Sequence, residues 1–331
     1  MRPTGFAFVA AAIALLGFAE LAAAQNFRAP QHTVDIPPLL YGPNAEFAPF
    51  NADAGMEVER DRDPRLLLDE HRKLDQAFAT LQPQRKGVIE AYVVAIALDS
   101  DPVFAREARE AGKVLAQRYD AVGRTIVLAG SDGSGPSPLP NGSPESLATA
   151  LARVAEVMDP KEDVLVLYTT SHGAPFGIAY HDGDQGYGAI SPFRLARMLD
   201  SLGIERRMVI LSACFAGVFL PALVSDTTVV VTAASMDRTS FGCRAQNDWT
   251  FFGDAFVNHA LRKPQPLDRA FADADLMIKQ WESGGRLVPS EPQLLVGAGA
   301  GAAWLNALES RVPKTASAPV GRPATDALTM K

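Results

Sequence analysis

Cysteine is scarce in this chain, and clustered positive charge is missing. Only Cys214 and Cys243 occur in 331 residues, which excludes a framework of several disulfides. The formal net charge is −7, the sequence pI is about 5.3, and Lys and Arg form no basic block. A general nucleic-acid binder needs such a block to meet phosphates, so we expect no nucleic-acid partner. The two cysteines remain compatible with one disulfide.

The motifs of several common cofactor sites and nucleophiles are also missing. His32, His71 and His259 have no partners at the spacing of a metal site. HDGDQG (181–186) lacks the spacing and the final Glu of an EF-hand and is typical of a hairpin tip. GAGAGAA (297–303) lacks the following strand and ribose-binding acid of a dinucleotide site. Since no Gly-x-Ser-x-Gly elbow occurs either, we expect no metal, no cofactor and no serine nucleophile.

The first residues have the pattern of a secretory signal. Arg2 gives a positive start, residues 5–18 are apolar, and three consecutive alanines suited to signal peptidase follow. The apolar stretch is short for a membrane span of ~20 residues, and Glu20 interrupts its far side. We therefore expect a signal peptide at 1–24, cleaved after Ala24, with export to the periplasm and no stable membrane insertion afterwards. A membrane anchor is the alternative.

The remaining chain divides into an arm, a central domain and a tail. Residues 25–87 predict an irregular arm followed by one amphipathic helix over 64–82, where apolar residues recur at helical spacing. Residues 88–312 predict the main domain. The last segment, PKTASAPVGRPATDALTMK (313–331), is typical of a disordered tail.

The central domain alternates strand-like and helix-like segments. Five short apolar runs rich in Val, Ile and Thr predict strands buried on both faces: AYVVAIAL, RTIVLA, VLVLYTT, RMVILSA and TTVVVTAA. Between them, capping residues stand directly before prolines, which indicates helix starts at Asp101-Pro102, Ser143-Pro144 and Ser191-Pro192. This alternation predicts a mostly parallel sheet covered by helices on both sides. A small hairpin is expected at FGIAYHDGDQGYGAI, after the third strand.

Two residues capable of catalysis follow two consecutive strands of this predicted sheet. His172 comes after VLVLYTT and Cys214 after RMVILSA. Because the carboxyl ends of parallel strands meet at one edge, we expect the imidazole and the thiol at the same edge. A neighbouring histidine raises the thiolate fraction of a thiol whose pKa is ordinarily about 8.5, and it can protonate a leaving amine.

The small residues beside this pair fit the same chemistry. The N–H groups of Gly173 and Cys214 are expected to form an oxyanion hole. Taken singly, Cys214 is equally compatible with a small core side chain and His172 with a loop histidine. Their placement after consecutive strands favours catalysis.

With this pair in place, the chain resembles a known family. His172-Gly173 and Ala213-Cys214 resemble the His-Gly and Ala-Cys signature of the caspase-like cysteine peptidases. TAASMDRTSFGC (232–243) and FFGDAF (251–256) resemble the legumain and glycosylphosphatidylinositol-transamidase branch, and the resemblance covers about residues 88–311. It implies a caspase-like three-layer α/β sandwich with a mostly parallel central sheet, and hydrolysis of peptide bonds through a thioester.

The same resemblance implies a substrate pocket. Thr239, Ser240 and Asp254 match the pocket residues of the family. Arg106 falls near the position of its basic pair, and Ser212 stands where the family has an acidic residue. A polar or basic substrate side chain opposite Asp254 is therefore expected.

The resemblance finally implies that Cys214 is a free thiol and that Cys243 is a neighbour supporting the pocket loop. We therefore expect a cysteine endopeptidase that acts on protein or peptide substrates through a Cys214–His172 dyad, with a transpeptidase or transamidase as a mechanistic variant. The alternative is a catalytically inactive caspase-like binding module of the cell envelope, with both cysteines oxidised. The sequence does not define an oligomeric state.

Overall fold

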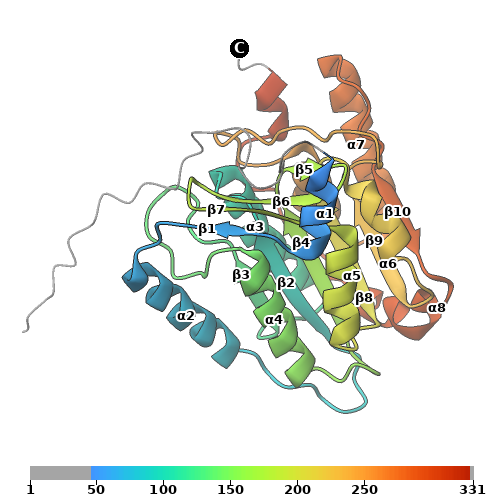
Figure 1. The fold of residues 1–331 in the computed structure, drawn as a ribbon. Coiled ribbons are helices and arrows are strands. Elements are labelled where there is room, and N and C mark those ends of the chain that lie inside the picture. Colours follow the sequence, from blue (N-terminus) through green and yellow to red (C-terminus); the bar gives the residue numbers. More distant parts are fainter. Residues whose placement is uncertain (1–45, 329–331) are drawn as a thin grey trace, which may run out of the picture.

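The structure is a computed structural model that describes residues 46–328. The predicted signal peptide and the first part of the predicted arm lie outside the described residues. A central sheet of six strands is enclosed between two layers of helices, and a smaller sheet of four strands lies above its edge (Figure 1).

The central sheet contains all five predicted strands. Its order is β10-β9-β8-β4-β2-β3. All neighbouring strands run parallel except β10, the edge strand, which pairs antiparallel with β9. The predicted α/β sandwich with a mostly parallel sheet is therefore confirmed. The strands are β2 (Ala91–Ala97), β3 (Thr125–Leu128), β4 (Val164–Thr170), β8 (Arg207–Ser212), β9 (Thr228–Thr232) and β10 (Gln293–Val296).

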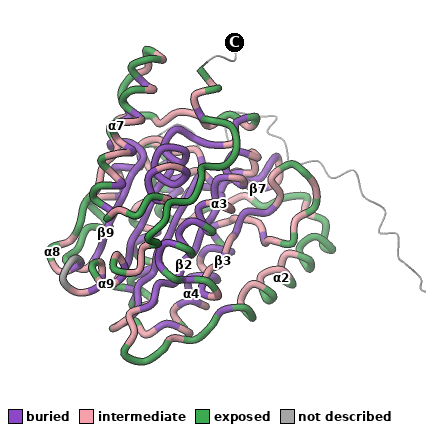
Figure 2. The backbone as a smooth tube through the Cα atoms, turned by 180° about the vertical axis from the view of Figure 1, so that it is seen from behind, coloured by how far each residue is buried: buried purple, intermediate pink, exposed green. Residues whose placement is uncertain are grey.

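Helices cover both faces of this sheet (Figures 1 and 2). One face packs against α4 (Pro144–Val157), α5 (Pro192–Ser201), η1 (Ala216–Phe219) and α6 (Leu220–Leu223). The other packs against α3 (Pro102–Arg118), η2 (Gly253–Ala260), α7 (Leu267–Gly285), α9 (Asn306–Glu309) and η4 (Ala324–Leu328). The short α8 (Ala298–Ala300) and η3 (Gly301–Leu305) follow β10. None of the helices between residues 46 and 328 combines the length and apolar character needed to cross a bilayer.

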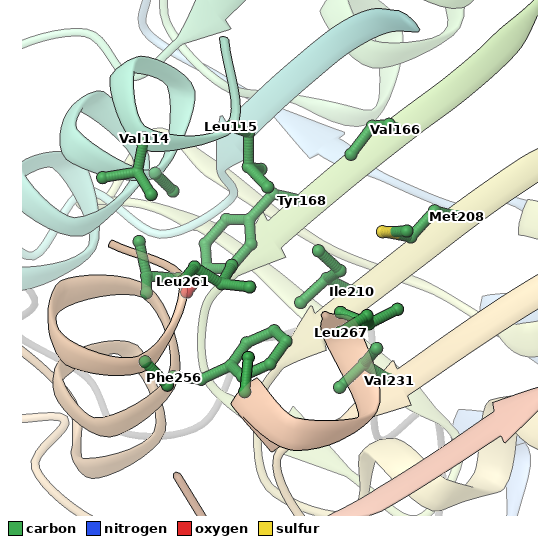
Figure 3. Close-up of a cluster of buried hydrophobic side chains, with 14 of the residues drawn as sticks. Val114, Leu115, Val166, Tyr168, Met208, Ile210, Val231, Phe256, Leu261 and Leu267 are labelled. Carbon is green, nitrogen blue, oxygen red and sulfur yellow. The ribbon is translucent and has the colours of Figure 1, made fainter. Parts of the chain in front are cut away.

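Alternate residues of each strand serve opposite faces, as the period of a β-strand requires. Val166 and Ile210 belong to the core under α3 and η2, whereas Leu167 and Val209 belong to the core under α4 and α5. Figure 3 shows the first of these cores, where side chains from the sheet meet those of three helices. Burial on both faces explains why the strands are continuously apolar in sequence.

The helices α3, α4 and α5 begin at the prolines that mark their predicted starts. The Ser143 hydroxyl accepts a hydrogen bond from Ser146 N at 3.0 Å, and the Ser191 hydroxyl accepts one from Arg194 N at 3.1 Å. These caps satisfy N–H groups that a helix leaves unpaired at its first turn.

The predicted hairpin is present as β6 (Gly177–Asp182) and β7 (Gly186–Ile190). It belongs to a small sheet of order β1-β7-β6-β5, with β1 (Val58–Glu59) and β5 (Gly173–Ala174) at its edges. Because β5 directly follows His172, the small sheet stands over the carboxyl edge of the central sheet.

The arm contains more structure than its sequence predicts. α1 (Phe47–Ala54) packs through Ala52 against Ala189 of β7, and β1 adds to the hairpin, so tertiary contacts order a segment without clear periodicity. α2 (Pro64–Ala79) lies within the predicted helix but buries none of its residues (Figure 2).

Residues 313–328 differ from the predicted disordered tail, because they pack along η2. Trp249 Nε1 donates to Val320 O at 2.8 Å, and Val320 N donates to Asn258 Oδ1 at 2.9 Å. Ala324 N donates to a buried oxygen of Asp254 at 2.8 Å. Composition alone cannot reveal such partners, which lie more than sixty residues away in the chain.

Candidate active site

The site is built on the carboxyl ends of two neighbouring parallel strands. The register of β4 and β8 ends with Thr170 opposite Ser212, and Ser171 N still donates to Ser212 O at 3.2 Å. His172 and Cys214 each stand two residues beyond that last pair. The structure therefore brings the predicted catalytic pair to one edge of the sheet.

Gly173 and Cys214 are in direct backbone contact. A Cβ added at Gly173 would collide with Cys214 O and would lie 3.1 Å from Cys214 N. Only glycine, which has no Cβ, allows the two backbones to come this close. The two residues predicted to form the oxyanion hole are therefore adjacent.

The sulfur of Cys214 lies within a set of hydrogen-bond donors. Ser240 N donates to it at 3.3 Å, and the thiol of Cys243 also donates to it. These hydrogen bonds, first that from Cys243, lower the pKa of Cys214 below the ordinary value of a thiol. The same contact, together with burial, raises the pKa of Cys243. Both cysteines are free and half-buried.

The imidazole of His172 rests on an aromatic ring of α3. Its centroid lies 5.1 Å from that of Phe104, with the two rings at 79°. This edge-to-face contact is a favourable arrangement and restricts how the imidazole can turn. No motif in the sequence marks Phe104 as part of the site.

The residue after the cysteine has an unusual backbone. Phe215 has φ 57°, a left-handed conformation that is rare for an aromatic residue, and its N–H donates to Arg238 O at 2.7 Å. Such strained residues persist where the surroundings hold them, and they often lie at functional sites. The sharp turn sends the chain into η1 directly after Cys214.

The predicted pocket residues separate into two groups. Ser240 contacts the Cys214 sulfur, and Thr239 beside it is exposed, so these two lie at the site. Arg106 instead binds backbone carbonyls of Asp132 and Ala245, at 3.1 and 2.7 Å, and joins α3 to the loop before η2.

The side chains of Ser212 and Asp254 are buried and hydrogen-bonded to other protein groups. The Ser212 hydroxyl donates to Glu107 at 2.7 Å and is buried. Asp254 is fully buried; its oxygens accept from Asn258 Nδ2 and Ala324 N, both at 2.8 Å, and it contacts His259. The expectation that Asp254 faces a substrate side chain is therefore corrected: the carboxylate anchors the C-terminal segment.

Asp254→Ala should consequently destabilise the protein without changing the peptide preference of the expected peptidase. Removing a buried charged acceptor from two donors is expected to cost about 3 kcal/mol of unfolding free energy. Urea unfolding measures this loss, and Asp75→Ala on the exposed surface of α2 is the control, expected within about 0.5 kcal/mol of wild type. An altered peptide preference at unchanged stability would return Asp254 to the pocket.

A cavity of about 480 Å³ opens at the neighbouring strand ends. Ala97 and Asp99 at the end of β2, Gly130 after β3, and Leu67 and Glu70 of α2 are among its lining residues. Burial raises the pKa of the Asp99 carboxyl well above its ordinary value. Neither His172 nor Cys214 lines this cavity, but β2 is next to β4 in the sheet.

No group of three or more side chains suited to hold a metal ion occurs among the described residues. The site residues are instead a thiol pair, an imidazole and backbone N–H groups. This set supports nucleophilic chemistry at a carbonyl carbon.

Residues 144–288, which include His172 and Cys214, match the model of the Peptidase C13 family. A comparison with curated proteins gives no match. Among solved structures, caspase-1 from Spodoptera frugiperda is similar with a TM-score of 0.42 and 13% identity, over 65% of this chain and 93% of that chain. The C13 match confirms the predicted resemblance of this chain to the legumain and glycosylphosphatidylinositol-transamidase family of peptidases.

Proposed function

We propose that this protein is a cysteine endopeptidase in which Cys214 is the nucleophile and His172 the general base. The observation that carries the proposal is the register of β4 and β8, beyond which the two residues follow at equal distance along neighbouring strands. The C13 match over the same segment supports a peptidase.

In the proposed reaction, the Cys214 thiolate attacks the carbonyl carbon of the scissile bond, and the carbonyl electron pair moves to oxygen. The N–H groups of Gly173 and Cys214 donate to this oxyanion. As the tetrahedral intermediate collapses, the C–N bond breaks and protonated His172 gives its proton to the leaving amine. The acyl group remains on Cys214 as a thioester.

The thioester is resolved by a second attack. Water, deprotonated by His172, yields the free acid and regenerates the thiolate. An amine in place of water forms a new amide bond, which is the transpeptidase or transamidase variant. Both outcomes use the same residues.

The contact between the two thiols favours a second candidate function. A Cys214–Cys243 disulfide would block attack on a peptide and leave a binding module of the same fold. The two candidates differ in whether the reduced protein has a reactive Cys214.

Labelling by a peptidyl electrophile directed at cysteine peptidases tests the proposal. Under reducing conditions, one equivalent should attach to Cys214, because its lowered pKa makes the thiolate available. Peptide mapping by mass spectrometry locates the adduct. His172→Ala should slow the labelling, and an unlabelled reduced protein would support the binding module instead.

A further inference from the structure

A fully buried carboxylate lies beneath the proposed dyad. Glu107 stands on α3 at the face that packs against the central sheet, and its side chain is inaccessible to solvent. Burying a charge is costly unless hydrogen bonds satisfy it. The hydrogen-bond donors around Glu107 therefore indicate which parts of the fold this carboxylate holds together.

Five hydrogen bonds to Glu107 join three separate segments. Oε1 accepts from the hydroxyls of Tyr168 and Thr170 in β4, at 2.7 and 2.9 Å, and from the hydroxyl of Ser212 in β8, at 2.7 Å. Oε2 accepts from the N–H and the hydroxyl of Thr250, at 2.9 and 2.8 Å, in the segment before η2. All of these donors are uncharged.

Two of the partners are the last paired residues before the dyad. Thr170 and Ser212 lie opposite each other at the ends of β4 and β8, and both donate to the same oxygen. His172 and Cys214 each follow two residues later. A shift of either strand end relative to the other would stretch one of these bonds.

The surroundings are shaped around this carboxylate. A Cβ added at Gly253 would collide with Glu107 Oε2, so the glycine admits the acid. Gly253 N also donates to the Thr250 hydroxyl at 2.9 Å, which fixes that hydroxyl as a donor to Glu107.

The charge of Glu107 also reaches the thiol pair. Hydrogen bonding to Cys214 and burial raise the pKa of Cys243, and the negative charge of Glu107 raises it further.

We propose that Glu107 is a positioning residue for the proposed peptidase reaction: it fixes the strand ends that carry His172 and Cys214. This inference rests on the proposed function. Glu107 itself touches no reacting atom.

Glu107→Gln tests the proposal, because it keeps the size of the side chain and removes its charge. Displacing a catalytic group by about 1 Å can cost on the order of 10²-fold in rate. We expect a loss of this size in kcat with little change in KM. Glu90→Gln is the control: Glu90 is a similarly buried acid, paired with Arg124, and it directly precedes β2 at the amino end of the strands. It should lose stability but keep its kcat.

The milder variants Ser212→Ala and Thr170→Val keep the test valid if Glu107→Gln folds poorly. Each removes one donor to Glu107 and should lower kcat by about tenfold. Combined with Glu107→Gln, neither should lower it further, because residues of one network are not additive. Additive losses would overturn the proposal.

The pH dependence of Cys214 alkylation by iodoacetamide supplies a measurement that does not need peptide cleavage. Shifted strand ends would loosen the hydrogen bond from Ser240 N that lowers the pKa of Cys214, so Glu107→Gln should move the midpoint to higher pH, and Glu90→Gln should not move it. A midpoint that stays at the wild-type pH in Glu107→Gln would overturn the proposal. A protein that shows the upward shift but cleaves no peptide would refute the peptidase function and leave the role of Glu107 intact.

Discussion

Cys214→Ser should abolish peptide cleavage while the protein remains folded. A serine hydroxyl is hardly ionised near neutral pH, so the attack on the carbonyl carbon is lost, and we expect a fall in kcat/KM on the order of 10⁴-fold or more. The half-buried side chain keeps its size, so the melting temperature should stay within about 4 °C of wild type. Fluorogenic peptides and thermal unfolding measure the two quantities.

His172→Ala should cause a loss of similar size, and the double variant should be no worse than either single one. The two groups act as one unit, so their effects do not add. His71→Ala is the matched control, since His71 is exposed on α2. Cleavage by Cys214→Ser at the wild-type rate would end the proposed mechanism.

Oxidation should switch the activity off completely and reversibly. The Cys214 thiolate is expected to attack oxidised glutathione and release one reduced glutathione; the Cys243 sulfur then attacks the mixed disulfide and releases the second. Two thiols become one disulfide, and one glutathione disulfide becomes two thiols. The Cys243 thiol interacts with Cys214 closely enough to lower the pKa of Cys214, so we expect the second attack to be within reach.

Activity should be undetectable in the oxidised protein and should return in full with dithiothreitol. Mass spectrometry of the unreduced protein should show a Cys214–Cys243 crosslink. Cys243→Ser separates the steps: it should keep most activity, because a hydroxyl can replace the thiol as donor, and it should stop at the mixed glutathione adduct. An oxidised wild type that carries only that adduct would contradict the expectation.

The architecture was predictable because its signals are local. Strands buried on both faces must be continuously apolar, and a capping residue before a proline marks a helix start, as Ser143 and Ser191 show. The meeting of His172 and Cys214 follows from topology, since neighbouring parallel strands end at one edge.

The pocket was less predictable, because its chemistry depends on distant partners. No local sequence pattern shows that the Asp254 carboxylate accepts a hydrogen bond from Ala324 N, or that the Ser212 hydroxyl donates one to Glu107. One feature of the sequence does indicate Glu107. It lies at helical spacing from Phe104 and Ala111, on a helical face that is otherwise apolar. A lone acid on such a face indicates a buried hydrogen-bond network.

The bonded strand ends have a consequence for how activity can be controlled. Hydrogen bonding between β4 and β8 continues to Ser171, and Gly173 touches the Cys214 backbone, so separating the two strand ends would require opening the central sheet. The strand ends that carry His172 and Cys214 are therefore held together before any substrate arrives, so binding costs little ordering entropy in these segments. A regulator that leaves the fold intact can act on the Cys214 sulfur itself, as oxidation would, or on the segments around it, and need not move the strand ends.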